Sequence, residues 1–264
     1  MNQKMLILAL ETSGRIGSVA LGLSEKMLEE HTFSAPLAHS EEILPAIKNL
    51  IKKYAQKPEK IKNICLAIGP GSFTGLRIAV TIAKTMNLAN NAVITTVDTL
   101  DVIAENFHPS LMDINSGQQL TDRRKKLNAI QLPLNAKRIA VILDAKRAKF
   151  YIAIYQRTKI ISPEPNSASQ WKKILPDSLM TVEEFIKKFA NPQTPIWLLG
   201  EGLLYYKEKF NVPGLKILEQ KYWSPSARNV YKLGWEKIKK GIFADPLTLT
   251  PKYLRKPDAK IKKI

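Results

Sequence analysis

The sequence predicts an α/β protein with two lobes, each built from a mixed sheet flanked by helices. Two observations predict this class. Short apolar stretches of strand length alternate with segments of helical periodicity along most of the 264 residues. The plan of the first half then returns weakly in the second half, which indicates an internal duplication. In both halves the first strand ends in an acidic residue, Glu11 or Asp144, and glycines follow the fourth strand, at 69–75 and 200–202.

The first hundred residues carry the clearer pattern. Over 39–54 apolar residues recur at helical spacing, with Ser40 as the expected N-cap and Pro45 early enough in the helix to be tolerated. Residues 76–89 contain no helix breaker and are read as a second helix. Alternating or continuous apolar runs predict the strands. The elements expected in this half are strands at 6–10, 16–23, 26–33, 64–68 and 92–97, and helices at 39–54, 76–89 and 98–106.

The second half is expected to contain strands at 138–143, 148–155, 195–199 and 215–218, with helices at 181–190, after 202 and at 226–240. Residues 107–137 are polar, basic and poor in periodicity, as in an inserted loop or linker. We therefore divide the chain into four parts. These are an N-terminal lobe at 1–107, joined by the C-terminal helix at about 225–241, a basic insert at 108–137, a C-terminal lobe at 138–224 and a basic tail at 242–264.

Composition points to a soluble cytoplasmic protein. No apolar run approaches the ~20 residues that a membrane helix needs, and the chain enters a strand pattern directly, without a signal-peptide cleavage site. The single cysteine, Cys65, excludes an internal disulfide framework. The formal net charge of +18 invites a nucleic-acid interpretation, but the lysines are scattered through every helix, which favours a general compositional bias. The cluster Arg123–Lys126 and the tail are the local exceptions.

A glycine-rich segment, Gly69–Gly75, lies between an apolar strand and a helix. Glycine permits backbone angles and close approaches that a Cβ would block, and the N–H groups of a helix start are available to an anion. The spacing nevertheless fits neither the phosphate loop G-x-x-x-x-G-K-[ST] nor the dinucleotide fingerprint G-x-G-x-x-G. Both of these nucleotide motifs are therefore excluded.

Four strings of residues together resemble the TsaB (YeaZ) family of tRNA-modification proteins, whose actin-like ATPase fold is a duplicated ribonuclease-H-like fold. The resemblance extends over most of the first hundred residues, and in the second half it is limited to a few short strings. The strings are Leu8–Ser13 with Ser18–Leu21 and His39–Glu41, the extended Gly69–Ile78, Asp144–Arg147 with Phe150–Tyr151, and the late Pro251–Arg255.

This resemblance implies a noncatalytic partner subunit. Family members pair with their paralogue TsaD, and the ATPase TsaE joins them. The complex transfers a threonylcarbamoyl group to the adenosine next to the anticodon of tRNAs that read codons beginning with A. The first two helices of the family supply the pairing surface, and the same surface forms a homodimer in isolation. The resemblance further implies that tRNA is reached through the complex, that ATP and magnesium act at the level of the complex, and that the chain needs no cofactor of its own.

Carried onto this sequence, the pairing surface falls on the two helices at 39–54 and 76–89. The second of these has only two charged residues, Arg77 and Lys84, so more than one of its sides should be covered. Burial inside its own lobe and burial against a partner both fit that composition. The residues expected to bind the partner are His39, Ser40, Ile43, Ile47, Leu76, Ala79, Val80 and Ala83.

Glu11 and Asp144 occupy the positions where actin-like ATPases place the carboxylates that organise magnesium. A vestigial nucleotide site would comprise Glu11, Thr12, Ser13, Gly71, Ser72 and Asp144. The alternative is structural: Glu11 accepts N–H groups in its own turn, and Asp144 caps a hairpin and pairs with Lys146 or Arg147. We favour the structural alternative because the first turn lacks the glycine-rich phosphate loop of active kinases.

The sequence predicts no catalytic residue and no metal site. Its three histidines, His31, His39 and His108, are not three or four residues apart, and no cysteine pair could replace them. No Ser-centred elbow supports a serine nucleophile. His39 begins a helix, so we expect it to cap that helix or contact a partner. Two alternatives to the partner subunit stay open: a free-standing actin-fold ATPase or kinase, and a tRNA-binding module built on the basic insert and tail.

Overall fold

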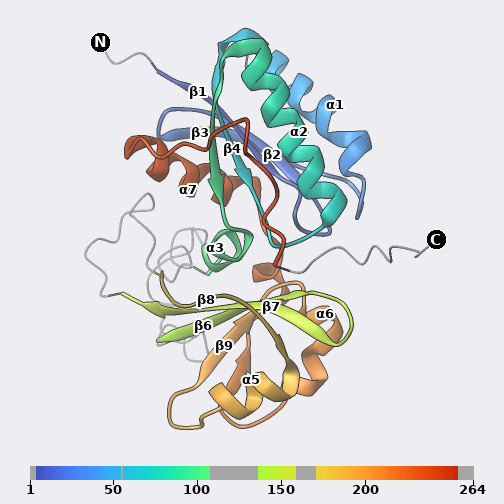
Figure 1. Ribbon diagram of the computed structural model, residues 1–264, viewed down its shortest axis with the longest axis vertical. Coiled ribbons are helices and arrows are strands. Elements are labelled where there is room, and N and C mark those ends of the chain that lie inside the picture. Colours follow the sequence, from blue (N-terminus) through green and yellow to red (C-terminus); the bar gives the residue numbers. More distant parts are fainter. Residues whose placement is uncertain (1–3, 55, 108–135, 159–170, 255–264) are drawn as a thin grey trace, which may run out of the picture.

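The computed structural model describes residues 4–54, 56–107, 136–158 and 171–254, and these residues form two lobes stacked one above the other (Figure 1). Each lobe holds a mixed five-stranded sheet, so the predicted fold class is confirmed. Most of the basic insert predicted at 108–137, its cluster Arg123–Lys126 included, and the end of the tail from residue 255 lie outside the described residues.

The sheet of the N-terminal lobe has the order β3-β2-β1-β4-β5. β1 pairs antiparallel with β2 and parallel with β4, and β2 and β3 form the expected hairpin. Its strands are β1 (Leu6–Glu11), β2 (Ser18–Leu23), β3 (Lys26–Thr32), β4 (Ile61–Ala67) and β5 (Val93–Val97).

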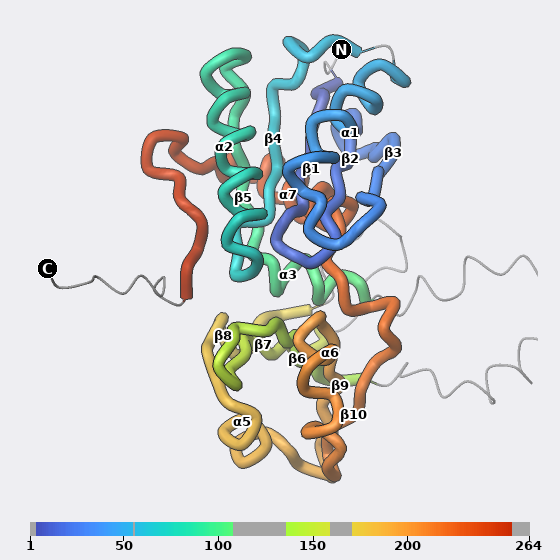
Figure 2. The backbone as a smooth tube through the Cα atoms, turned by 90° about the vertical axis from the view of Figure 1, so that its right-hand side faces the viewer, coloured from blue at the N-terminus to red at the C-terminus, as the bar shows by residue number. Residues whose placement is uncertain are grey.

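Helices cover both faces of this sheet because the strands are apolar on both sides. α1 (His39–Lys53) and α2 (Phe73–Asn90) pack on the face that contains Leu8, and α7 (Ala227–Lys239) packs on the opposite face, against Ala9. A Cβ on Gly234 would lie 2.3 Å from the Sγ of Cys65, so this glycine lets α7 approach β4 closely. α7 thus returns from the end of the chain to complete the first lobe (Figure 2).

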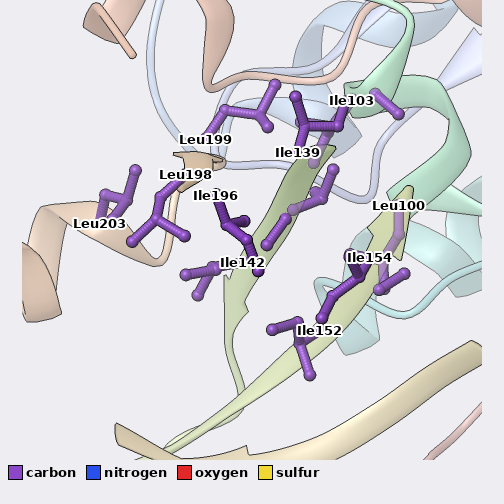
Figure 3. Packing of buried hydrophobic residues seen from close by; sticks show 14 of the residues in the cluster. Leu100, Ile103, Ile139, Ile142, Ile152, Ile154, Ile196, Leu198, Leu199 and Leu203 are labelled. Atoms are coloured by element: carbon purple, nitrogen blue, oxygen red, sulfur yellow. The ribbon is translucent and has the colours of Figure 1, made fainter. Parts of the chain in front are cut away.

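The second sheet has the order β10-β9-β6-β7-β8. Its strands are β6 (Arg138–Asp144), β7 (Lys149–Arg157), β8 (Trp171–Thr181), β9 (Ile196–Leu199) and β10 (Leu215–Ile217), with α5 (Val182–Phe189) and the short α6 (Leu203–Tyr206) outside. On one face Phe150 meets Phe185 and Phe210 at ring-centroid distances of 6.0 and 5.7 Å. Toward the other lobe, Leu100 and Ile103 of α3 (Thr99–Ala104) join the same core beside Ile139 and Ile154 (Figure 3). α3 therefore connects the lobes.

Three expectations about elements are corrected. Strand β8 was not predicted, because its two lysines and Pro176 obscure the alternation; as an edge strand it tolerates a proline that a central strand would not. Ser40 is not the N-cap of α1, since the helix begins at His39 after Ala38 and has no side-chain cap. α2 begins at Phe73 rather than at residue 76, because the side chain of Ser72 caps it by accepting from Gly75 N–H at 3.2 Å.

Candidate functional site at the lobe junction and the α1–α2 groove

Glu11 ends β1 at the lobe junction and is fully buried. Its Oε1 accepts hydrogen bonds from the backbone N–H groups of Ser13 and Gly14 and from the hydroxyl of Ser13, as the structural alternative predicts. Its Oε2 has no hydrogen-bond partner among the described residues. Burial raises the pKa of Glu11 to about 7, although the three hydrogen bonds oppose the shift. The carboxyl group therefore organises the turn that follows β1.

The glycine-rich segment lies directly against this turn. A Cβ on Gly71 would stand 2.4 Å from Ser13 O, and one on Gly75 would stand 1.8 Å from Thr12 O. Ser72 N–H donates to Ser13 O at 2.8 Å, and the hydroxyl of Thr12 donates to Gly75 O at 2.7 Å. The glycines thus serve a close backbone contact, and the chain itself takes up N–H groups at the start of α2 that an anion would need.

Asp144 ends β6 on the opposite side of the junction. Its Oδ1 accepts hydrogen bonds from Lys146 N–H at 2.9 Å and from the hydroxyl of Tyr206 at 3.0 Å, and its Oδ2 pairs with Lys146 Nζ at 2.7 Å. Partial burial tends to raise the pKa of Asp144, but the bonds from Lys146 and Tyr206 outweigh it, so the pKa falls below its usual value. Both carboxylate oxygens are therefore occupied by the chain's own donors.

A cleft of about 490 Å³ separates the two lobes at this point. Four of the six residues predicted for a vestigial nucleotide site line it, namely Ser13, Gly71, Ser72 and Asp144, whereas Glu11 and Thr12 are buried and are not in its lining. Magnesium would have to displace Lys146 from Asp144, and phosphates would compete with Ser13 O for the N–H of Ser72. The residues present do not form a ready site for a magnesium nucleotide.

Sequence reasoning missed the contact between Glu201 and Arg15, which joins the walls of this cleft. Glu201, which follows β9, accepts Arg15 N–H at Oε2 (2.9 Å) and the hydroxyl of Ser224 at Oε1 (2.8 Å). It is almost fully buried, and that burial raises its pKa. The glycines on either side of Glu201 marked the turn, but nothing local in the sequence indicated a contact with a residue 186 positions away.

The residues predicted to bind a partner lie mostly inside the lobe. His39, Ile43, Ile47, Leu76, Ala79, Val80 and Ala83 are buried, and only Ser40 is exposed. His39 lies with Nε2 3.1 Å from Gly14 O and packs beside Phe33, so it is a core histidine that caps no helix. Burial lowers its pKa. Most of these side chains hold α1 and α2 on the sheet, whereas Ser40 and Ile43 also line the surface between the two helices.

A groove of about 430 Å³ lies between α1 and α2. Its exposed apolar members include Leu44, with 61% of its surface accessible, and Phe73, with 41%. The groove is lined by Ser40, Ile43, Leu44, Phe73, Thr74, Arg77, Ile78, Thr81 and Ile82. Leu44 of α1 and Phe73 of α2 thus leave apolar surface exposed to solvent at this groove.

Comparison with known proteins finds one family model that matches part of the chain and relatives that are named TsaB. The model of the family "TsaD: tRNA N6-adenosine threonylcarbamoyltransferase" matches residues 33–118. The tRNA threonylcarbamoyladenosine biosynthesis protein TsaB of Bacillus subtilis (strain 168) is 26% identical over 261 residues, which cover 98% of this chain and 97% of that protein. TsaB of Escherichia coli (strain K12) is 28% identical over 153 residues, 58% of this chain and 56% of that one.

A solved structure supports the fold. YeaZ from Pseudomonas aeruginosa superposes with a TM-score of 0.68 at 21% identity, and the match covers 94% of this chain and 99% of that one. Within the described residues no helix is long and apolar enough to cross a membrane.

Proposed function

The chain belongs to the TsaB (YeaZ) family and has a role in tRNA threonylcarbamoyladenosine biosynthesis, and we propose that it acts there as the noncatalytic partner subunit of a TsaD–TsaB–TsaE complex. In this proposal TsaD transfers the threonylcarbamoyl group to the adenosine next to the anticodon of tRNAs that read codons beginning with A. The chain binds TsaD, stabilises it and reaches tRNA through it, in the cytoplasm.

The groove between α1 and α2 is the observation that carries the proposal. Full burial of a leucine or phenylalanine side chain stabilises a complex by about 1.5–3 kcal/mol, and the groove presents one of each beside Ile78 and Ile82. Two helices of TsaD, laid against α1 and α2, would complete a bundle and remove these side chains from water. In the absence of TsaD a second copy of this chain would cover the same surface.

The lobe junction supports the noncatalytic part. Asp144 is engaged by Lys146 and Tyr206, and it would have to give up these contacts in order to bind a metal ion. In this proposal ATP and magnesium act at the level of the complex.

Binding to the cognate TsaD tests the proposal. Leu44→Glu places a carboxylate in the groove and should weaken TsaD binding about 100-fold, because the charge loses water on association. Ile174→Glu is the matched control, since Ile174 is 46% exposed on β8 of the other lobe. The measurements are calorimetric affinity and threonylcarbamoyladenosine formation by TsaD and TsaE on tRNA, with and without this chain.

Wild-type TsaD affinity in Leu44→Glu would contradict the interface. Threonylcarbamoyladenosine formation that is equally fast without the chain would contradict the role. ATP turnover by the chain alone, abolished by Asp144→Ala, would establish a free-standing ATPase instead. Salt-sensitive tRNA binding without TsaD, lost when Arg123–Lys126 are neutralised, would establish a tRNA-binding module.

A further inference from the structure

The segment at 250–253, here called the strap, crosses from the first lobe to the lobe junction (Figure 1 and Figure 2). Lys252 N–H donates to Ile68 O at 2.8 Å, and Lys252 O lies 2.8 Å from the position that a Cβ on Gly69 would take. Gly69 has a φ of +118°, a conformation open to glycine and strained for other residues. The strap is therefore fixed against the start of the glycine-rich segment by backbone contacts.

Ion pairs fix the strap a second time, across the two lobes. Lys252 Nζ lies 3.0 Å from Asp98 of the first lobe and 2.7 Å from Asp177 of β8. Lys173, also on β8, pairs with Asp177 at 2.7 Å and with Asp101 of α3 at 2.7 Å. The side chain of Asp177 is only 3% exposed, so this is a partly buried network and holds more firmly than an isolated surface pair.

The residue after Lys252 reaches the groove. The ring of Tyr253 lies 5.1 Å from that of Phe73, and its hydroxyl accepts a hydrogen bond from Arg77 Nε at 3.2 Å. The guanidinium carbon of Arg77 lies 3.9 Å from the centre of the Phe73 ring. Phe73 and Tyr253 thus hold Arg77, which is exposed to solvent, in one orientation at the mouth of the groove.

Arg77 is the single charged residue among the nine that line the groove. No carboxylate within the described ranges forms an ion pair with it. A guanidinium whose Nε is already bound presents its remaining N–H donors as a fork that matches a carboxylate, and an arginine ordered in advance loses less entropy on binding.

We propose that Arg77 is a receptor for a carboxylate on the partner helix that occupies the groove, and that Lys252 is the positioning residue that holds it through the strap and Tyr253. This inference rests on the proposed function, and it adds to an apolar surface the one polar contact that fixes the register of the partner. The partner helix accordingly carries an aspartate or glutamate among apolar residues.

The test measures affinity for the cognate TsaD at low and high salt. Arg77→Met should lower the affinity about tenfold at 50 mM NaCl and should bind with a weaker salt dependence than wild type, because the paired charge is gone. Arg77→Lys, which keeps the charge but loses the fork, should keep the salt dependence and recover part of the affinity. Lys252→Met should lower the affinity about threefold, and Lys252→Arg should restore it.

The double variant Arg77→Met/Lys252→Met separates positioning from a general structural effect. If Lys252 acts through Arg77, the double variant binds no more weakly than Arg77→Met alone. Lys239→Met is the matched control, since Lys239 pairs with Glu236 on α7, on the face of the sheet opposite the groove, and should not alter binding. Thermal unfolding of every variant confirms that it is folded.

Three outcomes would overturn the inference. These are wild-type affinity of Arg77→Met at both salt concentrations, equal salt dependence of Arg77→Met and wild type, and additive losses in the double variant. If Leu44→Glu abolishes binding while Arg77→Met binds normally, only the role of Arg77 as a carboxylate receptor is contradicted, and the proposed function stands. If neither variant weakens binding, the groove is not the interface.

Discussion

Replacing Glu11 by glutamine should remove a loss of stability that the wild-type protein suffers as pH rises. In the folded protein burial raises the pKa of Glu11 from its ordinary 4.5 to about 7, while in the unfolded chain it titrates at the ordinary value. Between these two pH values the folded state binds more protons than the unfolded state, so the free energy of unfolding falls with pH. The stabilisation is fully present below pH 4.5 and is lost as pH rises through 7.

The size of the effect follows from the shift. A difference of about 2.5 pKa units corresponds to about 3 kcal/mol between the two ends of this range, at 1.36 kcal/mol per unit. Glutamine keeps an Oε1 that can accept from Ser13 and Gly14, and its amide nitrogen occupies the site of the unpartnered Oε2 without a charge. Glu11→Gln should therefore match wild type near pH 5 and exceed it in stability near pH 8.

Urea unfolding measured from about pH 5 to about pH 8.5 gives the required curves. His39, whose pKa is lowered by burial, contributes an opposite slope, but it is present in both proteins and cancels in the difference. Glu59→Gln, at an exposed glutamate, is the matched control and should follow wild type throughout. Parallel curves for wild type and Glu11→Gln would refute the reasoning.

Two further predictions concern buried positions of the first lobe. Gly75→Ala should destabilise the protein by about 3 kcal/mol or more in urea unfolding, because its Cβ would lie 1.8 Å from the backbone oxygen of Thr12. Gly241→Ala is the comparison: no atom lies within 4 Å of its Cβ position and its φ is +66°, so it should cost about 1 kcal/mol. Equal losses in the two variants would contradict this prediction. Burial raises the pKa of Cys65 to about 12. An aromatic disulfide reagent at pH 8 should therefore label this thiol only as fast as the protein unfolds. Rapid labelling without denaturant would show that α7 does not cover β4.

Periodicity predicted most of the fold because it reports which face of an element is apolar. It located α1, α2 and α7, and the strands of both sheets apart from β8. β8 has an exposed, lysine-bearing outer edge, and its pairing with β7 depends on tertiary contacts that no local pattern records.

The residues predicted to bind a partner show what hydrophobic periodicity cannot resolve. α2 is apolar on nearly every side, so composition could not tell the face that packs on its own sheet from the face that lines the groove. The contacts of Glu201 with Arg15 and of Lys252 with Asp98 join positions 186 and 154 residues apart. Only the fold brings such pairs together, whereas the glycine-rich segment was visible because its geometry is encoded locally.

The return of α7 to the first lobe sets the order in which the protein can be completed during synthesis. All five strands of the first sheet have been synthesised once residue 97 is made, but the face that holds Ala9 and Cys65 is covered only by residues 227–239. The nascent N-terminal part must carry an open apolar face while the entire second lobe is translated and folds beneath it. A chain that stops before residue 227 therefore lacks α7 and leaves one face of the first sheet uncovered.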